Sequence, residues 1–179
     1  RLLLARGQAG AALQQIRSLA TAEEPGATVL ALYGDALLAA RQVEPAAEAY
    51  AAAVAADAAS PEALIGQAEM AVRSDRERDA IELLDRARSS LERRIRPPSL
   101  RARMLTLYGR AYLLANRTDA ARRELEQAIE LAGAPPEAHF FLGESWSSAN
   151  SATARTHYER YLELAPEGPF AARARRGVR

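Results

Sequence analysis

Small and bulky apolar residues recur along the chain in a fixed order, with a period close to 34 residues. Each repeat has a small residue, an alanine eleven or twelve positions later, a bulky residue four positions on, and a further residue three positions after that. Four sets follow this order: Gly34, Ala46, Tyr50 and Ala53; Ala68, Ala80, Leu84 and Ala87; Gly109, Ala121, Leu125 and Ala128; Gly143, Ala154, Tyr158 and Tyr161. Residues three and four apart share one helix face, so the pattern predicts two packed helices per repeat.

The residue sizes predict how the two helices meet. A glycine or alanine on the first helix allows close approach, the alanine on the second gives a matching flat surface, and the bulky residue fills the space between hairpins. Pro61, Pro136 and Pro166 fall between repeats, where a helix has to begin or end. The same register continued backward reaches Ala12, so a partial repeat is expected to lead the chain.

This order of residues resembles the tetratricopeptide repeat over nearly the whole chain. The resemblance implies an all-α fold, a right-handed α-solenoid in which each repeat is a helix A, a tight turn and an antiparallel helix B. The expected division is a partial repeat at 1–26, with the tail of a helix A at 1–6; full repeats at 27–60, 61–94, 102–135 and 136–166; an insert at 95–101; and a C-terminal capping helix within 167–179.

The register is broken in two places. The insert at 95–101 contains Pro97-Pro98, and we expect it to lengthen the preceding helix B by about two turns, with an early start to the next helix A. In the fourth repeat the register is one residue shorter, which predicts a shorter turn at Asn150-Ser151. Tyr161 there replaces a small residue, which requires a looser packing surface beside it.

The resemblance implies that helices A line a concave groove that receives a segment of a partner protein. The predicted partner-binding residues are Leu32, Asp35, Leu38, Ile65, Glu69, Arg73, Arg103, Thr106, Arg110, Leu113, Phe140, Phe141 and Glu144. Gly66 also maps to the groove. Because two adjacent aromatic side chains cannot both point into one core, Phe140 and Phe141 are expected to give an exposed aromatic contact; the alternative is that such apolar positions are core.

Charges alternate along the predicted groove, acidic in the first two full repeats, basic at Arg103 and Arg110, and acidic again at Glu137 and Glu144. A partner with a basic–acidic–basic order would complement them, although charges on exposed helix faces are often only solvated. The clamp with which some tetratricopeptide arrays hold a C-terminal carboxylate is absent, because Arg103 alone matches it.

Composition narrows the function classes. Apolar residues make up 49% and aromatic residues 6%, which favours close-packed helices, and the net charge of +1 provides no general attraction for nucleic acid. All 24 basic residues are arginine and there is no cysteine, so disulfides and thiol chemistry are excluded. No apolar run is long enough for membrane insertion. The start at Arg1 without Met suggests a segment of a longer protein.

Seven arginines gather between residues 86 and 103: Arg86, Arg88, Arg93, Arg94, Arg96, Arg101 and Arg103. They could meet phosphate, an acidic partner or an anionic lipid, but no aromatic residue interleaves them to stack on bases. We favour the interpretation that they are solvated and pair with acids elsewhere in the array.

No pattern indicates catalysis, a cofactor or a metal. The two histidines, His139 and His157, are eighteen residues apart on different predicted helices, and His157 is expected at the surface. Trp146 is expected in the core. The sequence thus predicts a protein–protein interaction scaffold, not an enzyme, with a protein or peptide partner of unknown identity. A homo-oligomer formed through the N-terminal face and a regulatory arm of a larger enzyme remain alternatives. The Ala and Arg bias suggests a bacterial protein, in cytoplasm or periplasm.

Overall fold

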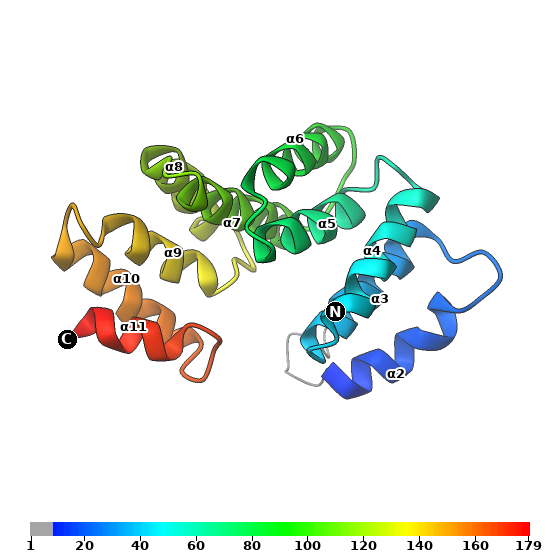
Figure 1. Ribbon diagram of the computed structural model, residues 1–179, viewed down its shortest axis with the longest axis horizontal. Coiled ribbons are helices and arrows are strands. Elements are labelled where there is room, and N and C mark those ends of the chain that lie inside the picture. The colour runs from blue at the N-terminus through cyan, green and yellow to red at the C-terminus, as the bar shows by residue number, and fades with distance from the viewer. Residues whose placement is uncertain (1–8) are drawn as a thin grey trace. The chain divides into compact units, whose positions relative to one another are not determined.

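The computed structural model describes residues 9–179, and within them every regular element is a helix (Figure 1). The helix predicted at 1–6 lies outside the described residues. The ten helices are α2 (Ala9–Ala20), α3 (Ala27–Ala39), α4 (Val43–Ala56), α5 (Pro61–Arg73), α6 (Glu77–Glu92), α7 (Pro98–Leu114), α8 (Thr118–Ile129), α9 (Glu137–Trp146), α10 (Ser151–Leu164) and α11 (Ala171–Val178).

The chain forms two compact units. Unit 1 runs to Ser74 and includes Glu82–Arg94, and unit 2 comprises Asp75–Ile81 and Ile95–Arg179. In unit 1, α3 packs against α2, α4 and α5, and α4 also contacts α5. In unit 2, α7 packs against α8 and α9, while α10 lies between α9 and α11. Consecutive helices therefore form hairpins, and the first helices of neighbouring hairpins also touch.

Three of the hairpin turns have the same backbone conformation. Arg41, Asp75 and Asn116 each have a positive φ, between 52° and 61°, at the middle of a three-residue connection. In the first turn the Gln42 amide donates to the Leu37 carbonyl at 2.9 Å, which closes the end of α3. This left-handed residue reverses the chain in few residues, and it recurs at the spacing of the repeat.

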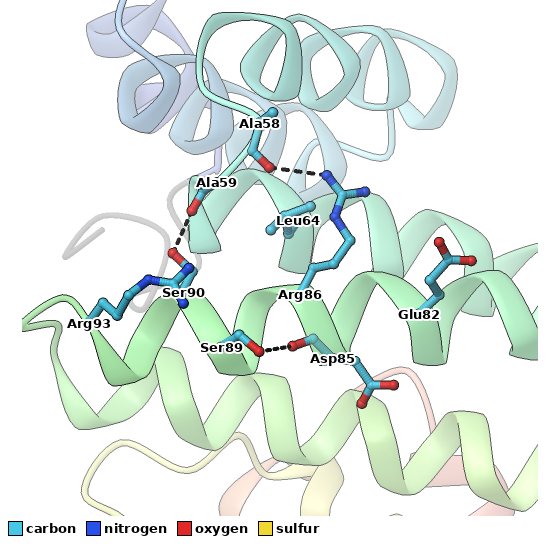
Figure 2. Close-up of a pocket in the computed structure, with 9 residues that line it drawn as sticks. All are labelled: Ala58, Ala59, Leu64, Glu82, Asp85, Arg86, Ser89, Ser90 and Arg93. Atoms are coloured by element: carbon cyan, nitrogen blue, oxygen red, sulfur yellow. Dashed lines mark hydrogen bonds between the residues drawn. The ribbon is translucent and has the colours of Figure 1, made fainter.

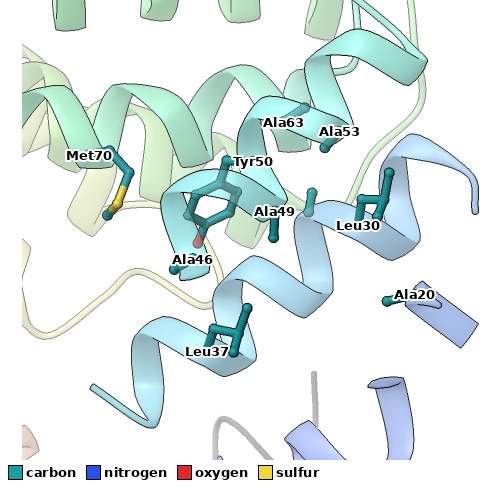
Figure 3. Close-up of a cluster of buried hydrophobic side chains, with 10 residues drawn as sticks. Ala20, Leu30, Leu37, Ala46, Ala49, Tyr50, Ala53, Ala63 and Met70 are labelled. Carbon is teal, nitrogen blue, oxygen red and sulfur yellow. The ribbon is translucent and has the colours of Figure 1, made fainter. Parts of the chain in front are cut away.

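The core of unit 1 is built around Tyr50 of α4, which is fully buried among alanines (Figure 3). A Cβ added to Gly34 would lie 2.6 Å from the Tyr50 ring, so α3 can approach α4 only without a side chain there. A Cβ on Gly66 of α5 would also collide with this ring. Gly66 is buried and packs against Tyr50, so its assignment to an open groove is wrong.

Unit 2 repeats the arrangement twice. A Cβ on Gly109 of α7 would strike the side chain of Leu125 from α8, and one on Gly143 of α9 would lie 2.6 Å from the ring of Tyr158 in α10. Leu125 is fully buried and Tyr158 nearly so. The predicted close approach at the small residue is confirmed in these hairpins, but the side chain that meets it is the bulky residue of the second helix, which was expected between hairpins.

The insert differs from expectation in one respect. The helix before it, α6, ends at Glu92 and has 16 residues, against 14 in α4, so the predicted two-turn extension is wrong. Pro97 and Pro98 disfavour helical geometry in the residues before them, and Arg94 turns away to pair with Asp57 at 2.9 Å. The early start of the next helix A is confirmed, because α7 begins at Pro98 and has 17 residues, against 13 in α3.

The fourth repeat is one residue shorter because its first helix, α9, ends early, and not because its turn is shorter. The α9 helix ends at Trp146, three residues after Gly143, whereas α3 continues five residues past Gly34. The connection to α10 is four residues long, and Asn150 caps α10 by accepting the Thr153 amide at 3.1 Å. The prediction of a shorter turn is therefore wrong.

Tyr161 is also accommodated differently from the prediction. It is fully buried, and its hydroxyl accepts a hydrogen bond from the Phe170 amide at 3.0 Å. A Cβ on Gly168 would collide with this hydroxyl, so a glycine in the loop provides the room. The packing beside Tyr161 is close and not loose.

Candidate functional site on the first helices of the hairpins

The predicted groove residues of unit 1 lie on α3 and α5, which pack side by side. Leu32, Asp35 and Leu38 of α3 are half-buried, at the spacing of one helix face. On α5, Ile65 is completely buried, so it belongs to the core and not to an open surface. Glu69 is half-buried and pairs with the exposed Arg73 one turn later, at 3.1 Å.

A hydrogen bond from the core fixes the position of the Asp35 carboxylate. Its Oδ1 accepts a hydrogen bond from the buried Tyr50 hydroxyl at 2.8 Å. The carboxylate therefore has a fixed position at the edge of the core, next to the two half-buried leucines of α3. A charge fixed in this way loses little side-chain entropy when a ligand binds.

In unit 2 the predicted residues of α7 divide in the same way. Arg103, Arg110 and Leu113 are half-buried, whereas Thr106 is 4% exposed and its hydroxyl donates to the Ala102 carbonyl at 2.8 Å. The Thr106 side chain is therefore buried, and its hydroxyl is already bonded within α7, so it is not open to a partner. The guanidinium of Arg110 lies 5.8 Å from the centre of the Phe141 ring, within range of a cation–π contact.

The expectation of an exposed aromatic at Phe140 or Phe141 is wrong. Phe140 is 1% exposed and Phe141 is 8% exposed. The ring of Phe170, at the start of α11, stacks on Phe140 with ring centres 4.4 Å apart and meets Phe141 edge-on at 5.2 Å. Adjacent side chains can both be buried here because the C-terminal segment adds a second layer above α9.

Glu144 lies where three helices meet. It accepts the Tyr158 hydroxyl of α10 at 2.7 Å and forms an ion pair with Arg173 of α11. Burial, reinforced by the hydrogen bond to this carboxylate, raises the pKa of Tyr158 well above its usual range. The Tyr158 hydroxyl therefore stays protonated and donates to Glu144, as the Tyr50 hydroxyl does to Asp35.

The two histidines, eighteen residues apart in the chain, lie together between α9 and α10. Their Nδ1 atoms are 3.2 Å apart and their ring centres 5.5 Å apart, and both side chains are half-buried, so His157 is less exposed than expected. Burial is the main cause that lowers the pKa of both rings; at His139 the charges of His157 and Arg160 add to it, and at His157 Glu126 opposes it. The hairpin thus favours neutral rings joined by one shared hydrogen bond.

This pair does not extend to a metal site. The two Nδ1 atoms, 3.2 Å apart, suit one N–H···N hydrogen bond. Within residues 9–179 no group of three or more potential metal ligands occurs.

Trp146 was expected in the core, and this prediction is also wrong. It is half-buried, with the guanidinium of Arg122 lying 3.8 Å from its ring centre. Arg122 also donates to the Ser145 carbonyl at 2.5 Å, so it joins α8 to the end of α9. The pair is a structural contact of unit 2.

Part of the arginine cluster borders a cavity in unit 1 (Figure 2). The cavity, of about 410 Å³, lies between α6 and the segment that joins α4 to α5. Arg86 donates to the Ala58 carbonyl at 3.1 Å and Ser90 to the Ala59 carbonyl at 2.5 Å. Arg94 pairs with Asp57, so for this residue the interpretation of pairing with an acid elsewhere in the array is confirmed. These contacts hold the segment that joins α4 to α5 in place.

The fold defines an all-α repeat protein made of helical hairpins, and no helix among the described residues is long and apolar enough to span a bilayer. No protein-family model and no curated protein sequence matches the chain.

Solved structures match it closely. One chain of the APC/C hetero-tetramer Cut9–Hcn1 matches with a TM-score of 0.81 and 17% identity, over 99% of this chain and 34% of the other. This chain thus spans about a third of that one. The Thermus thermophilus protein TTC0263, a tetratricopeptide repeat protein, matches over 99% of this chain and 94% of its own, with a TM-score of 0.74 and 23% identity.

A third match is YrrB, described as a tetratricopeptide repeat protein with an unusual peptide-binding site. It covers 85% of this chain and 74% of its own, with a TM-score of 0.56 and 18% identity. The chain therefore has the tetratricopeptide-repeat fold, an α-solenoid of antiparallel hairpins, as the sequence predicted.

Proposed function

We propose that this protein is an interaction scaffold that binds a segment of a protein partner along the first helices of its hairpins, and that it is not an enzyme. The observation that supports this proposal is that hydrogen bonds from buried side chains fix the positions of charged groups on these helices. Tyr50 fixes Asp35 in unit 1, and Tyr158 fixes Glu144 in unit 2. Preorganised polar groups beside half-buried leucines suit recognition of a peptide.

The residues available for contact are fewer than the sequence predicts. Ile65, Thr106, Phe140 and Phe141 are buried in the structure. The remaining candidates are at least partly exposed: Leu32, Asp35, Leu38, Glu69, Arg73, Arg103, Arg110, Leu113 and Glu144. In unit 1 the candidates are two leucines and Asp35 of α3 and the Glu69–Arg73 pair of α5; in unit 2 they are Arg103, Arg110 and Leu113 of α7 and Glu144 of α9.

The complementary partner for unit 1 has basic and apolar side chains, and the one for unit 2 has acidic side chains opposite Arg103 and Arg110. The YrrB relative supports the idea that this fold accommodates peptides, because a peptide-binding site is described for that protein. Fold similarity alone does not carry the proposal; the fixed charges of this chain do.

A peptide-display selection on the purified chain tests the proposal. We expect the selected peptides to lose at least about tenfold in affinity for Arg103→Glu/Arg110→Glu, because reversal of a charge at a recognition surface adds repulsion to the lost attraction. The matched control is Arg123→Glu, which changes an exposed arginine on α8, a second helix of its hairpin. Selected peptides that bind both variants like the wild type would contradict the proposal, as would a selection that enriches none.

A further inference from the structure

The start of α11 covers the face of α9 that the groove prediction assigned to a partner. Phe170 stacks on Phe140 with an interplanar angle of 11° and meets Phe141 edge-on at 65°. Its ring centre is also 6.4 Å from that of Tyr161. One aromatic side chain from the C-terminal segment thus fills a pocket made by three aromatic side chains of α9 and α10.

A charged contact accompanies the aromatic one. Arg173 pairs with Glu144, and its guanidinium carbon lies 5.6 Å from the centre of the Phe140 ring. Arg173 is three residues after Phe170, so the two side chains lie on the same side of the first turn of α11. The segment therefore presents an aromatic residue and an arginine, at a spacing of three, to a complementary aromatic and acidic surface.

The rest of α11 packs on α10, where Gly177 faces the Tyr158 ring, and Arg175 donates to the Pro166 carbonyl at 2.7 Å. The helix has eight residues, its buried side chains are Ala171 and Ala174, and Phe170 provides no side-chain cap at its N-terminus. The Arg173 side chain is 60% exposed. Helices of this length are marginal on their own, so the segment depends on its contacts with α9 and α10 to stay in place, and Phe170 and Arg173 provide those with α9.

We propose that residues 170–178 are a removable occupant of this surface, and that the surface binds in their place a partner helix with an aromatic residue and an arginine three positions later. The inference deepens the proposed function, since it assigns a partner chemistry to Phe140, Phe141 and Glu144. The buried position of the two phenylalanines is then the closed state of the site.

Tethering sets how strongly the segment competes. A segment joined through a short linker has an effective concentration on the order of millimolar, so a free helix of the same sequence competes poorly with it. Weakening the tethered contacts should let the free helix bind. The competition can be measured without knowledge of the natural partner.

The experiment uses a fluorescein-labelled peptide of residues 166–179 as the probe, with fluorescence anisotropy as the readout. We expect the full chain with Phe170→Ala to bind this peptide at least about tenfold more tightly than the wild type, because the tethered competitor has lost its anchor. The matched control is Arg176→Ala, which removes an exposed arginine from the same helix and should bind like the wild type.

A second variant covers a failure of the first to fold. Arg173→Glu changes only the exposed partner of Glu144, and we expect it to bind the wild-type peptide at least about fivefold more tightly than the wild-type chain does. The probe peptide with its own phenylalanine changed to alanine should bind neither variant. Circular dichroism establishes that each variant is folded.

Two results would overturn the inference. One is a folded Phe170→Ala or Arg173→Glu chain whose affinity for the peptide equals that of the wild type. The other is loss of folding in both variants, which would make the segment part of the core and not a removable occupant. Neither result bears on Arg103 and Arg110, so the proposed function can fail or survive separately.

Discussion

The hairpins α3–α4 and α9–α10 are closed by the same arrangement of side chains, yet different neighbours cover them. In each, a buried tyrosine of the second helix meets a glycine of the first, and its hydroxyl donates to the carboxylate that follows the glycine. In α3–α4 these residues are Gly34, Asp35 and Tyr50. A second glycine from the next helix, Gly66 or Gly177, also faces each tyrosine ring.

The surroundings of the two tyrosines differ. Tyr50 is packed among alanines of α4 and α5 (Figure 3), whereas Tyr158 lies beside Phe140, with ring centres 5.8 Å apart. Glu144 has Arg173 as an additional partner, and the histidine pair lies in the same hairpin. In the second hairpin the tyrosine is thus joined to an ion pair, and two titratable rings lie in the same hairpin.

The hairpin α7–α8 shows which part of the arrangement is required. It places Leu125 against Gly109, without a hydroxyl. A glycine facing a bulky residue is therefore sufficient to close a hairpin, and the hydroxyl has the additional effect of fixing an acid on the first helix. In this chain, stability and the placement of surface charge are coupled through one side chain.

The largest effect should come from removal of the tyrosine. We expect Tyr50→Ala and Tyr158→Ala each to cost about 3–5 kcal/mol of unfolding free energy, because a large cavity opens in a buried site. Urea unfolding followed by circular dichroism measures the loss, and Trp146 fluorescence reports on unit 2. Tyr112→Ala, at a half-buried position, is the control. A loss below about 1 kcal/mol at either tyrosine would contradict the shared role.

A smaller effect should follow from a methyl group on the glycines. Gly66→Ala and Gly177→Ala should each cost about 1–3 kcal/mol, because the new Cβ collides with the tyrosine ring. The double change Gly66→Ala/Tyr50→Leu should cost less than the sum of its parts. Gly10→Ala, with nothing within 4 Å of the new Cβ, is the control. Additive losses would mean that the collision is not the cause.

Removal of the hydroxyl alone should have a modest effect. Tyr50→Phe and Tyr158→Phe keep the buried ring and lose one hydrogen bond to a carboxylate, so we expect about 1 kcal/mol for each. If the hydroxyl also fixes the acid for binding, peptides selected on unit 1 should bind Tyr50→Phe more weakly. A loss above about 3 kcal/mol would show that the bond, and not the ring, closes the hairpin.

The smallest effect concerns pH and separates the two units. Because the folded-state pKa of both histidines is lowered, the unfolded chain binds more protons below its own His pKa, about 6.5. Stability of unit 2 should be constant above this pH and fall as the pH drops below it. Trp146 fluorescence during thermal unfolding at pH 7.5 and 5.5 measures the fall, and His157→Gln should reduce it. An equal shift in that variant would exclude the pair as the cause.

The sequence predicted the repeat because the repeat depends on residue size at helical spacing. The period marked Gly109 and Gly143 as points of close helix approach, and the structure shows close packing there, although Leu125 and Tyr158, and not the predicted alanines, make the contact. It predicted an early start of the helix after the insert, and α7 begins at Pro98, since a proline suits the first turn of a helix. These features are local or recur at a fixed separation, and a single sequence contains them.

The sequence predicted the candidate site less well than it predicted the repeat. Its charged members Asp35, Arg110 and Glu144 do lie partly exposed on the expected helices, but Ile65 and Thr106 are buried. The groove positions came from the repeat register, which specifies a side of the helix and not how far the next helix covers it. A neighbouring helix decided the difference at each of these positions.

What the sequence determined by itself is the order of hairpins, because small and bulky residues at fixed spacing allow only one close packing of the helices. What only the tertiary structure decided is which surface stays open. Phe140 and Phe141 are buried because Phe170, some thirty residues later, folds onto them, and His139 meets His157 because α9 and α10 bring them together. Such contacts depend on the rotation and approach of whole helices, which no local pattern in the chain encodes.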